Sequence, residues 1–417
     1  MNKGYQPDAS DVLYARQPIY DRALNTVGFE LLFRPSPEEP IPPSENGTVF
    51  DGDNATNEVM LRAFSDSDID LVCEQQPAFI NFTADTLQKA LPFNPKRIVI
   101  EVLESVTETE TVLSSIQKQR DDGYRIALDD YRRTDDLHPL IALADIVKLE
   151  YPAYTGDELR KTVKVLRRHG VQVLAEKIET QEQFEDCVEA GCDLFQGFFL
   201  SRPTSITGKT MPQSRLSVLQ LLQALNDPDT SLHQLANVVS QDVFLSVRML
   251  KLVNSASYRR AREIDSIQMA VVMLGMERIR ALANMLALSR LEDKPHALQR
   301  IAVNRANLTG RIYTRLAPSG FDTGYTAGLF SCLDAFFDQP LNEILAHIPL
   351  TNALADALLK RQGALGLALQ SAIDFEQGRW SNIDWDNLQK QGIQPSDLAF
   401  DMHCALQSSE ETPSSLD

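Results

Sequence analysis

The sequence predicts two domains of different fold class: an N-terminal α/β domain built as a TIM-like (β/α) barrel, and a C-terminal all-α domain. Two observations support this prediction. In the first half of the chain, short apolar runs recur at near-regular intervals, and each run ends in a polar residue. In the second half, apolar residues recur at helical spacing instead. A length of 417 residues also suits two domains better than one hydrophobic core.

Six apolar runs in the first half are predicted to be buried β-strands. The polar residues that end them are Asn81, Glu101, Asp129, Lys148, Glu176 and Gln196. The intervals between these residues are 20, 28, 19, 28 and 20, which suits one strand, one helix and two loops. Continuous apolar strands in repeated βα units favour a closed parallel barrel over an open sheet, and the polar strand ends of such a barrel meet at one mouth.

Residues 201–209 are predicted to separate the two domains. This segment contains proline, glycine and hydroxyl residues, and a helical period begins after it at Leu216 and Leu219. We therefore expect the barrel in residues 1–205 and the helical domain in residues 206–407. Residues 408–417, rich in Ser, Glu and Pro, are predicted to be a disordered tail, and residues 318–328 a glycine-containing loop.

The composition disfavours several classes of protein. The chain has 40 Lys+Arg against 58 Asp+Glu and a net charge of −18, which repels nucleic-acid phosphates, so nucleic acid is not an expected partner. The amino terminus has no signal-peptide core, and charged residues interrupt the most apolar stretch, so we expect no membrane span and a cytoplasmic location. Five scattered cysteines fit reduced thiols better than a disulfide framework.

The predicted mouth of the barrel is rich in carboxylates. Its candidate residues are Glu30, Asn81, Glu101, Asp129, Asp130, Lys148, Glu176, Glu179 and Gln196. Oxygen ligands without nearby His or Cys suit Mg²⁺ or Mn²⁺ and disfavour zinc. Two such ions form the usual clamp for displacement at phosphorus, so these residue types indicate phosphodiester hydrolysis. A single acidic residue after a strand is more often a helix cap or a solvated charge, but capping does not require Asn, Lys and Gln at the other strand ends.

The candidate residues stand in an ordered set of motifs that resembles EAL domains, the family of cyclic-di-GMP phosphodiesterases. The motifs are Glu30-Leu31-Leu32-Phe33-Arg34, Ile80-Asn81-Phe82-Thr83, Glu101 with Glu104, Asp129-Asp130, Lys148, Glu176 with Glu179, and Gln196-Gly197-Phe198. The resemblance spans residues 12–204. It implies that the protein hydrolyses c-di-GMP to linear pGpG by a mechanism that uses two Mg²⁺ or Mn²⁺ ions.

The resemblance also implies roles for individual residues. The metal ligands would be Glu30, Asn81, Glu101, Asp129, Asp130 and Glu176. The catalytic residues would be Lys148, Glu30, Asp129 and Glu176, with Lys148 positioning the attacking water. Arg34, Glu104, Glu179 and Gln196 would bind the substrate or support the site, Glu104 by anchoring the loop after Asp129.

The segment after Asp129-Asp130 departs from the family pattern. Active EAL domains typically continue Asp-Asp-Phe-Gly-Thr-Gly, whereas this chain reads Tyr131-Arg132-Arg133-Thr134. In addition, Lys177 stands where the family commonly has Gly. Two interpretations therefore stay open: an active phosphodiesterase, which we favour, and a catalytically inactive c-di-GMP sensor or protein-interaction scaffold.

The second half of the chain resembles the HDOD domain, through residues 250–256, residues 264–270 and Leu274-Gly275. The pairing resembles the EAL–HDOD architecture of bacterial signalling proteins. The parent HD phosphohydrolases need a His-Asp dipeptide, and this sequence has none. We therefore expect the helical domain to be non-catalytic and to bind an unidentified protein partner. A homodimer is compatible with the resemblance.

Overall fold

A computed structural model of the chain describes residues 13–34, 69–89, 91, 94–129, 139–201, 213–227, 229–241, 245, 249–250, 266–289, 291 and 294–410. The chain divides into two compact units, Met1–Leu200 and Ser201–Asp417.

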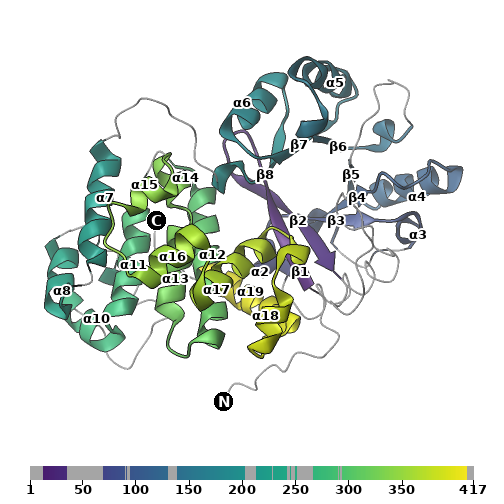
Figure 1. Cartoon of the computed structure of the whole chain (residues 1–417). Helices are drawn as coiled ribbons and strands as arrows, with labels where there is room; N and C mark the ends of the chain where they lie inside the picture. Colours follow the sequence, from purple (N-terminus) through teal and green to yellow (C-terminus); the bar gives the residue numbers. More distant parts are fainter. Residues whose placement is uncertain are drawn as a thin grey trace. The chain divides into compact units, whose positions relative to one another are not determined.

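The first unit is a closed barrel of strands in the order β1 to β8 (Figure 1). The strands are β1 (Leu13–Tyr20), β2 (Thr26–Arg34), β3 (Ala78–Phe82), β4 (Ile98–Val102), β5 (Arg125–Leu128), β6 (Ile146–Glu150), β7 (Gln172–Ile178) and β8 (Leu194–Gly197). The helices are α2 (Ile69–Val72), α3 (Ala84–Leu87), α4 (Glu110–Asp121), α5 (Gly156–Arg168) and α6 (Gln181–Ala190). Each strand from β2 to β7 pairs in parallel with its successor, so the predicted α/β barrel is confirmed.

Strand β1 is antiparallel to both of its neighbours, so the prediction of an all-parallel barrel is wrong at this strand. The hairpin between β1 and β2 is closed by Asp21, whose Oδ1 accepts hydrogen bonds from the backbone N–H groups of Ala23 (2.8 Å) and Asn25 (2.9 Å). So short a connection forces antiparallel pairing, because a parallel pair needs a crossover of about a dozen residues or more.

The interior of the barrel is built in two layers. The lower layer is apolar and consists of Ile19, Phe79, Val99, Ala127, Ile146, Leu174 and Leu194. Side chains alternate along a strand, so the residue two positions further on points into the same interior. From β3 to β8 those residues are Asn81, Glu101, Asp129, Lys148, Glu176 and Gln196. The packed apolar floor therefore supports a polar layer at the carboxyl ends of the parallel strands.

One irregularity in the sheet lies within the polar layer. The pairing of β7 with β8 shifts between Ala175 and Ile178, so two residues of β7, Glu176 and Lys177, oppose one residue of β8. Such a bulge re-aims the side chains around it. Opposite the bulge, Gly197 has a φ of +149°, and a Cβ there would lie 2.0 Å from the carbonyl oxygen of Ile178. Only glycine fits this close approach of two strands.

Replacing Gly197 with alanine is expected to destabilise the barrel by roughly 3 kcal/mol or more, because the new methyl group would clash with backbone rather than with a movable side chain. Urea unfolding followed by far-ultraviolet circular dichroism measures this loss. Gly170→Ala is the matched control, since Gly170 also has a positive φ (+79°) but no atom within 4 Å of its Cβ position. Equal losses in the two variants would contradict the steric explanation.

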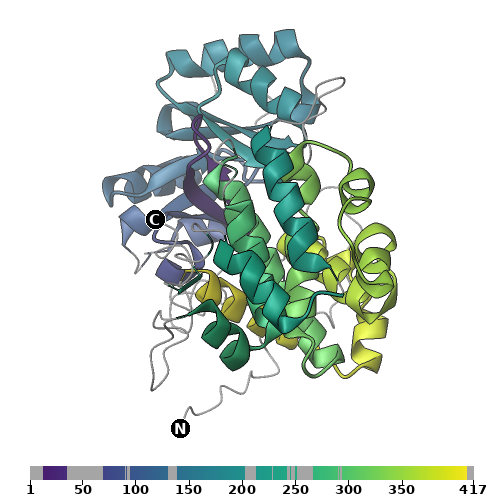
Figure 2. The same cartoon turned by 90° about the vertical axis from the view of Figure 1, so that its left-hand side faces the viewer.

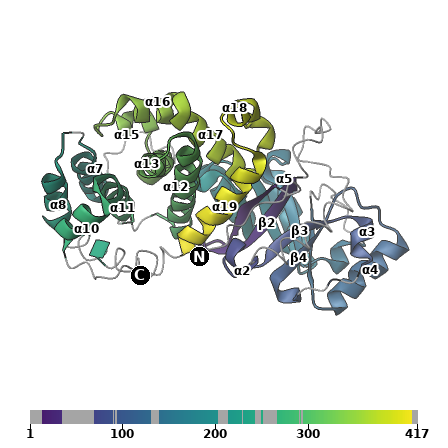
Figure 3. The same cartoon turned by 90° about the horizontal axis from the view of Figure 1, so that it is seen from below.

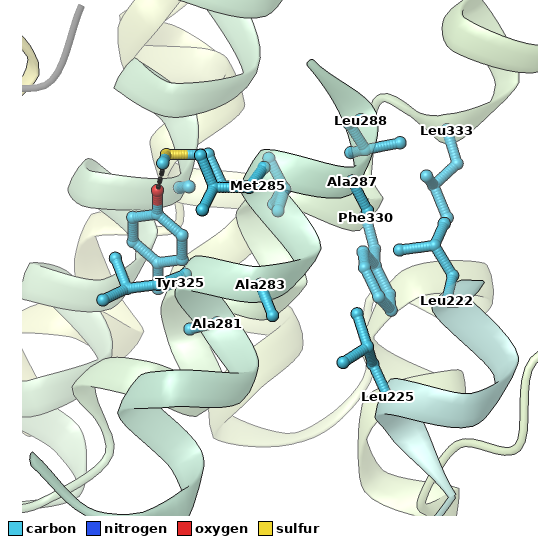
Figure 4. Close-up of a cluster of buried hydrophobic side chains, with 14 of the residues drawn as sticks. Leu222, Leu225, Ala281, Ala283, Met285, Ala287, Leu288, Tyr325, Phe330 and Leu333 are labelled. Atoms are coloured by element: carbon cyan, nitrogen blue, oxygen red, sulfur yellow. Dashed lines mark hydrogen bonds between the residues drawn. The ribbon is translucent and has the colours of Figure 1, made fainter. Parts of the chain in front are cut away.

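The second unit is all helical, as predicted, and Figures 2 and 3 show it from two further directions. Its helices are α7 (Gln213–Asn226), α8 (Leu232–Gln241), α10 (Ile267–Leu274), α11 (Met276–Leu288), α12 (His296–Leu316), α13 (Phe321–Phe330), α14 (Leu333–Phe337), α15 (Leu341–Leu345), α16 (Asn352–Lys360), α17 (Gly363–Glu376), α18 (Trp385–Lys390) and α19 (Pro395–Glu410). Its core buries residues from α7, α11 and α13 together, and Tyr325 donates a hydrogen bond to Met285 Sδ there (3.3 Å, Figure 4).

The prediction of a loop over residues 318–328 is wrong, because α13 occupies most of this segment. Its glycines serve helix packing. A Cβ on Gly328 would lie 2.6 Å from Ala306 Cα, and one on Gly324 would lie 2.8 Å from Gly310 Cα. Without these side chains, α13 packs directly against the backbone of α12, and this contact offsets the low helix propensity of glycine.

Replacing Gly328 with valine is expected to destabilise the helical unit by roughly 2–4 kcal/mol, because the side chain would push α13 away from α12. The protein has two tryptophans, Trp380 and Trp385, and both lie in this unit, so tryptophan fluorescence during urea unfolding reports the change. Ala353→Val, at an exposed position of α16, controls for the poor helix propensity of valine. A loss no larger than that of the control would contradict the close-packing argument.

Helix α19 runs through Ser408, whose Oγ accepts a hydrogen bond from Arg311 Nη2 (3.0 Å). The predicted disordered tail is therefore wrong for residues 408–410, and residues 411–417 lie outside the described part of the chain. Residues 251–256 and 264–265 of the HDOD-like motifs also lie outside it. Among the helices that the structure describes, none is long and apolar enough to cross a membrane.

Candidate functional site

The ammonium group of Lys148 lies among four carboxylates in the polar layer of the barrel. Its Nζ is 3.4 Å from Glu30 Oε1, 2.9 Å from Glu101 Oε1, 3.0 Å from Asp129 Oδ1 and 2.9 Å from Glu176 Oε1. The side chain of Lys148 is 1% exposed and that of Glu101 is fully buried. Because the carboxylates outnumber the ammonium, the layer keeps an excess of negative charge inside the barrel.

Burial and mutual repulsion shift the pKa values in this layer. Burial raises the pKa of Glu176 to about 8 and that of Glu101 well above its usual range, although Lys148 acts to lower both. Burial alone would lower the pKa of Lys148, but the surrounding carboxylates outweigh it and raise this pKa well above its usual range. Lys148 is therefore charged, and additional positive charge would stabilise the ionised carboxylates.

Glu30 is held in place by an amide from β8. Gln196 Nε2 donates hydrogen bonds to Glu30 Oε2 (2.6 Å) and to Gln17 Oε1 (3.0 Å). Gln17, on β1, is a member of the layer that the sequence reasoning missed. The signal was present, because Gln17 lies two residues from the interior Ile19 on the same strand. Strand β1 runs antiparallel to its neighbours, so along its sequence the polar-layer residue Gln17 comes before the apolar-layer residue Ile19.

Some buried oxygens of the polar layer have no hydrogen-bond donor among the described residues. They are Asn81 Oδ1, Glu101 Oε2 and Gln196 Oε1, whereas Glu101 Oε1 contacts the ammonium of Lys148. Asn81 and Glu101 are direct neighbours on β3 and β4. In the described residues no three Asp, Glu, His or Cys side chains are arranged to hold a metal ion, and Lys148 Nζ is the shared partner of the four carboxylates. The donor set is nonetheless all oxygen, partly unsatisfied and anionic, which fits Mg²⁺ or Mn²⁺.

The structure brings most of the candidate residues together, but not all of them. Glu104 lies in an exposed turn after β4, and Glu179 is exposed after β7, so both are outside the polar layer. Arg34 is the last residue of β2, where it pairs with Leu13, and its side chain is outside the described part. Asp130 and the altered residues 131–134 also lie outside the described residues.

A second ion pair lies directly above the polar layer, and the sequence reasoning missed it. Glu150 follows Lys148 by two residues on β6 and therefore points to the same side of the strand. Its carboxylate forms an ion pair with the ammonium of Lys177, the residue after Glu176 on β7. The spacing of Glu150 from Lys148 was the available signal.

Comparison with known proteins finds two families in this chain. The EAL domain model matches residues 59–203, and the HDOD domain model matches residues 211–340. The uncharacterized protein YuxH of Bacillus subtilis is 31% identical over 383 residues, which is 88% of this chain and 91% of that protein. Cyclic di-GMP phosphodiesterase CdgJ of Vibrio cholerae is 28% identical over 376 residues, 89% of this chain and 86% of that protein.

Two solved structures with remote similarity are Bacillus subtilis YkuI with c-di-GMP and calcium, and Klebsiella pneumoniae BlrP1 with calcium and c-di-GMP. The first is 20% identical, with a TM-score of 0.37 over 55% of this chain and 74% of that chain. The second is 21% identical, with a TM-score of 0.36 over 48% of this chain and 58% of that chain. Similarities of this size carry no information about what this chain binds.

The family matches follow the two units that the structure separates: all but the last three residues of the EAL match lie in the barrel unit, and the HDOD match lies in the helical unit. The similarity to YuxH runs through both units. This chain belongs to the family of bacterial proteins in which an EAL domain is followed by an HDOD domain.

Proposed function

We propose that this protein is a phosphodiesterase that hydrolyses c-di-GMP to linear pGpG with two divalent cations, Mg²⁺ or Mn²⁺. The observation that carries the proposal is the buried layer of four carboxylates around Lys148, at the carboxyl ends of the barrel strands. Active sites of such barrels lie at this end. The similarity to CdgJ along most of both chains supports the same activity.

Each residue of the layer has a role in this proposal. Glu30, Asn81, Glu101, Asp129 and Glu176 hold the cations, with Asp130 near the second one. Bound there, divalent cations would bind the phosphodiester and make a water molecule more acidic. Lys148 orients that water, and Gln196 keeps the carboxylate of Glu30 pointed into the barrel. Arg34, Glu104 and Glu179 bind the substrate or support the site, and Glu104 does so by anchoring the loop after Asp129.

The electrostatics explain why cations are needed before an anionic ligand can bind. The layer has four carboxylates around one ammonium, and the whole chain has a net charge of −18. A cyclic dinucleotide carries a negative charge on each phosphate and is repelled by such a site. The carboxylates of the layer would hold divalent cations, whose positive charge would attract the ligand, so binding of the proposed ligand depends on binding of the proposed cofactor.

We expect the purified protein to convert c-di-GMP to pGpG in Mn²⁺, and Asp129→Ala or Glu30→Ala to abolish the conversion by removing an anionic ligand. Chromatographic separation of c-di-GMP from pGpG measures the conversion. Asp157→Ala, which removes a carboxylate that is 87% exposed on α5, should keep wild-type turnover. No product from the wild-type protein at high concentration, in either Mn²⁺ or Mg²⁺, would refute the proposal.

A second candidate function, a c-di-GMP sensor without turnover, is favoured by one observation, the departure of Tyr131-Arg132-Arg133-Thr134 from the pattern of active EAL domains. Binding of c-di-GMP in Ca²⁺ without cleavage over hours in Mn²⁺ would support the sensor. A protein partner of the helical unit and a homodimer, both expected from the resemblance, stay predictions.

A further inference from the structure

The Lys177–Glu150 ion pair lies next to the proposed metal site without belonging to it. The carboxylate of Glu150 is 9% exposed, whereas the side chain of Lys177 is 52% exposed. The acidic partner is therefore buried within the barrel mouth, and the basic partner reaches it from the solvent side. An ammonium in this place covers a buried negative charge.

The position of Glu150 makes its charge matter to any ligand in the mouth. Glu150 pairs directly with Glu176 across β6 and β7, and it follows Lys148 by two residues. Its carboxylate is thus one step nearer the open end of the barrel than the ammonium of Lys148. An anion that enters from the carboxyl ends of the strands meets Glu150 before it reaches the polar layer.

The backbone shows that lysine at this position has a cost. Lys177 has a φ of +56°, in the left-handed region, and it lies in the bulge opposite Gln196. A residue with a Cβ is strained in this conformation, whereas a glycine is not. The contact with the buried carboxylate of Glu150 acts against that strain.

We propose that Lys177 is a charge-balancing residue of the barrel mouth, which masks Glu150 and thereby lets an anionic ligand approach the metal site. The inference rests on the proposed function for the identity of the ligand, and it deepens that function by naming a residue that tunes affinity. Lys177 weakens the attraction of the mouth for cations and strengthens its attraction for the dinucleotide. Lys177 therefore lowers the affinity for cations and raises the affinity for the dinucleotide.

The test compares wild-type protein with Lys177→Gly, which removes the ammonium and suits the local φ. Manganese affinity, from the electron paramagnetic resonance signal of free Mn²⁺, should tighten about three- to fivefold. The affinity for c-di-GMP, measured at saturating Ca²⁺, should weaken about five- to tenfold for the same electrostatic reason. Structural damage to the site would weaken the affinities for both Mn²⁺ and c-di-GMP. Changes of opposite sign in the two affinities therefore indicate a charge effect.

Three further variants make the test specific. Adding Glu150→Gln to Lys177→Gly removes the carboxylate that Lys177 contacts and should return both affinities to within about twofold of wild type. Lys177→Met, which keeps the bulky side chain, should shift both affinities as Lys177→Gly does. Lys164→Met, which removes an exposed ammonium from α5, should change neither.

The outcomes distinguish this inference from the proposed hydrolysis. Opposite shifts and their reversal by Glu150→Gln, in a protein that forms no pGpG, would support the masking role and refute the hydrolysis. If the wild-type protein forms pGpG, and Lys177→Gly leaves both affinities unchanged or weakens both, the masking role is overturned and the proposed hydrolysis is not.

Discussion

Replacing Lys148 with methionine is expected to destabilise the barrel by about 3–5 kcal/mol in the absence of divalent cations, and to abolish hydrolysis of c-di-GMP. The ammonium is within 3.4 Å of four carboxylates and is almost completely buried. Methionine has a similar length and no charge, so the carboxylates would face one another without a counter-ion. The same substitution removes the group that we propose to orient the attacking water.

Two spectroscopic signals distinguish a loss of stability in the barrel unit from a loss of stability in both units. Far-ultraviolet circular dichroism reports both units during urea unfolding, whereas the fluorescence of Trp380 and Trp385 reports the helical unit. The variant should lose stability by the first signal and keep the fluorescence transition of wild type. Lys164→Met, at an exposed position, should change neither. A variant as stable as wild type in EDTA would contradict the role of Lys148 as counter-ion.

A charge-compensating variant makes the interpretation stricter. Combining Lys148→Met with Glu101→Gln removes one carboxylate from the layer and should recover part of the lost stability, because fewer like charges remain. Turnover should stay abolished in the double variant. Recovery of stability without recovery of activity would show that the lysine has separate structural and catalytic roles.

Glu101→Gln alone is expected to act in opposite directions on stability and on turnover. The side chain is fully buried, and burial raises the pKa of Glu101 well above its usual range. An amide of the same shape avoids the cost of a buried charge and can donate to the unpaired Asn81 Oδ1 on the neighbouring strand. The free energy of unfolding in EDTA should therefore rise by about 1 kcal/mol.

Turnover of Glu101→Gln should fall by about 100-fold or more, because the amide contributes no negative charge to the cations. Product chromatography in Mn²⁺ measures the loss, and urea unfolding in EDTA measures the gain in stability. Asp157→Ala is again the control for a carboxylate outside the layer. A variant that loses both stability and turnover would show that Glu101 is part of the structural framework, which contradicts the metal-ligand role.

The sequence alone determined the barrel and most of its polar layer. A strand that is buried on both faces reads as an apolar run, and such runs recurred at the spacing of βα units. The residue that ends each run lies two positions beyond an interior residue, so Asn81, Glu101, Asp129, Lys148, Glu176 and Gln196 all point inward. Local periodicity was sufficient here, because neighbouring parallel strands repeat the same geometry.

Only the tertiary structure decided the features that depend on contacts between elements. The antiparallel strand β1 closes the barrel between β2 and β8, and its contribution of Gln17 follows from that pairing. Helix α13 forms despite its glycines, because α12 packs against its backbone. The Lys177–Glu150 pair joins β6 to a bulge in β7. In each case the stabilising contact lies between two different elements of secondary structure, and the local propensity of either element contains no information about such a contact.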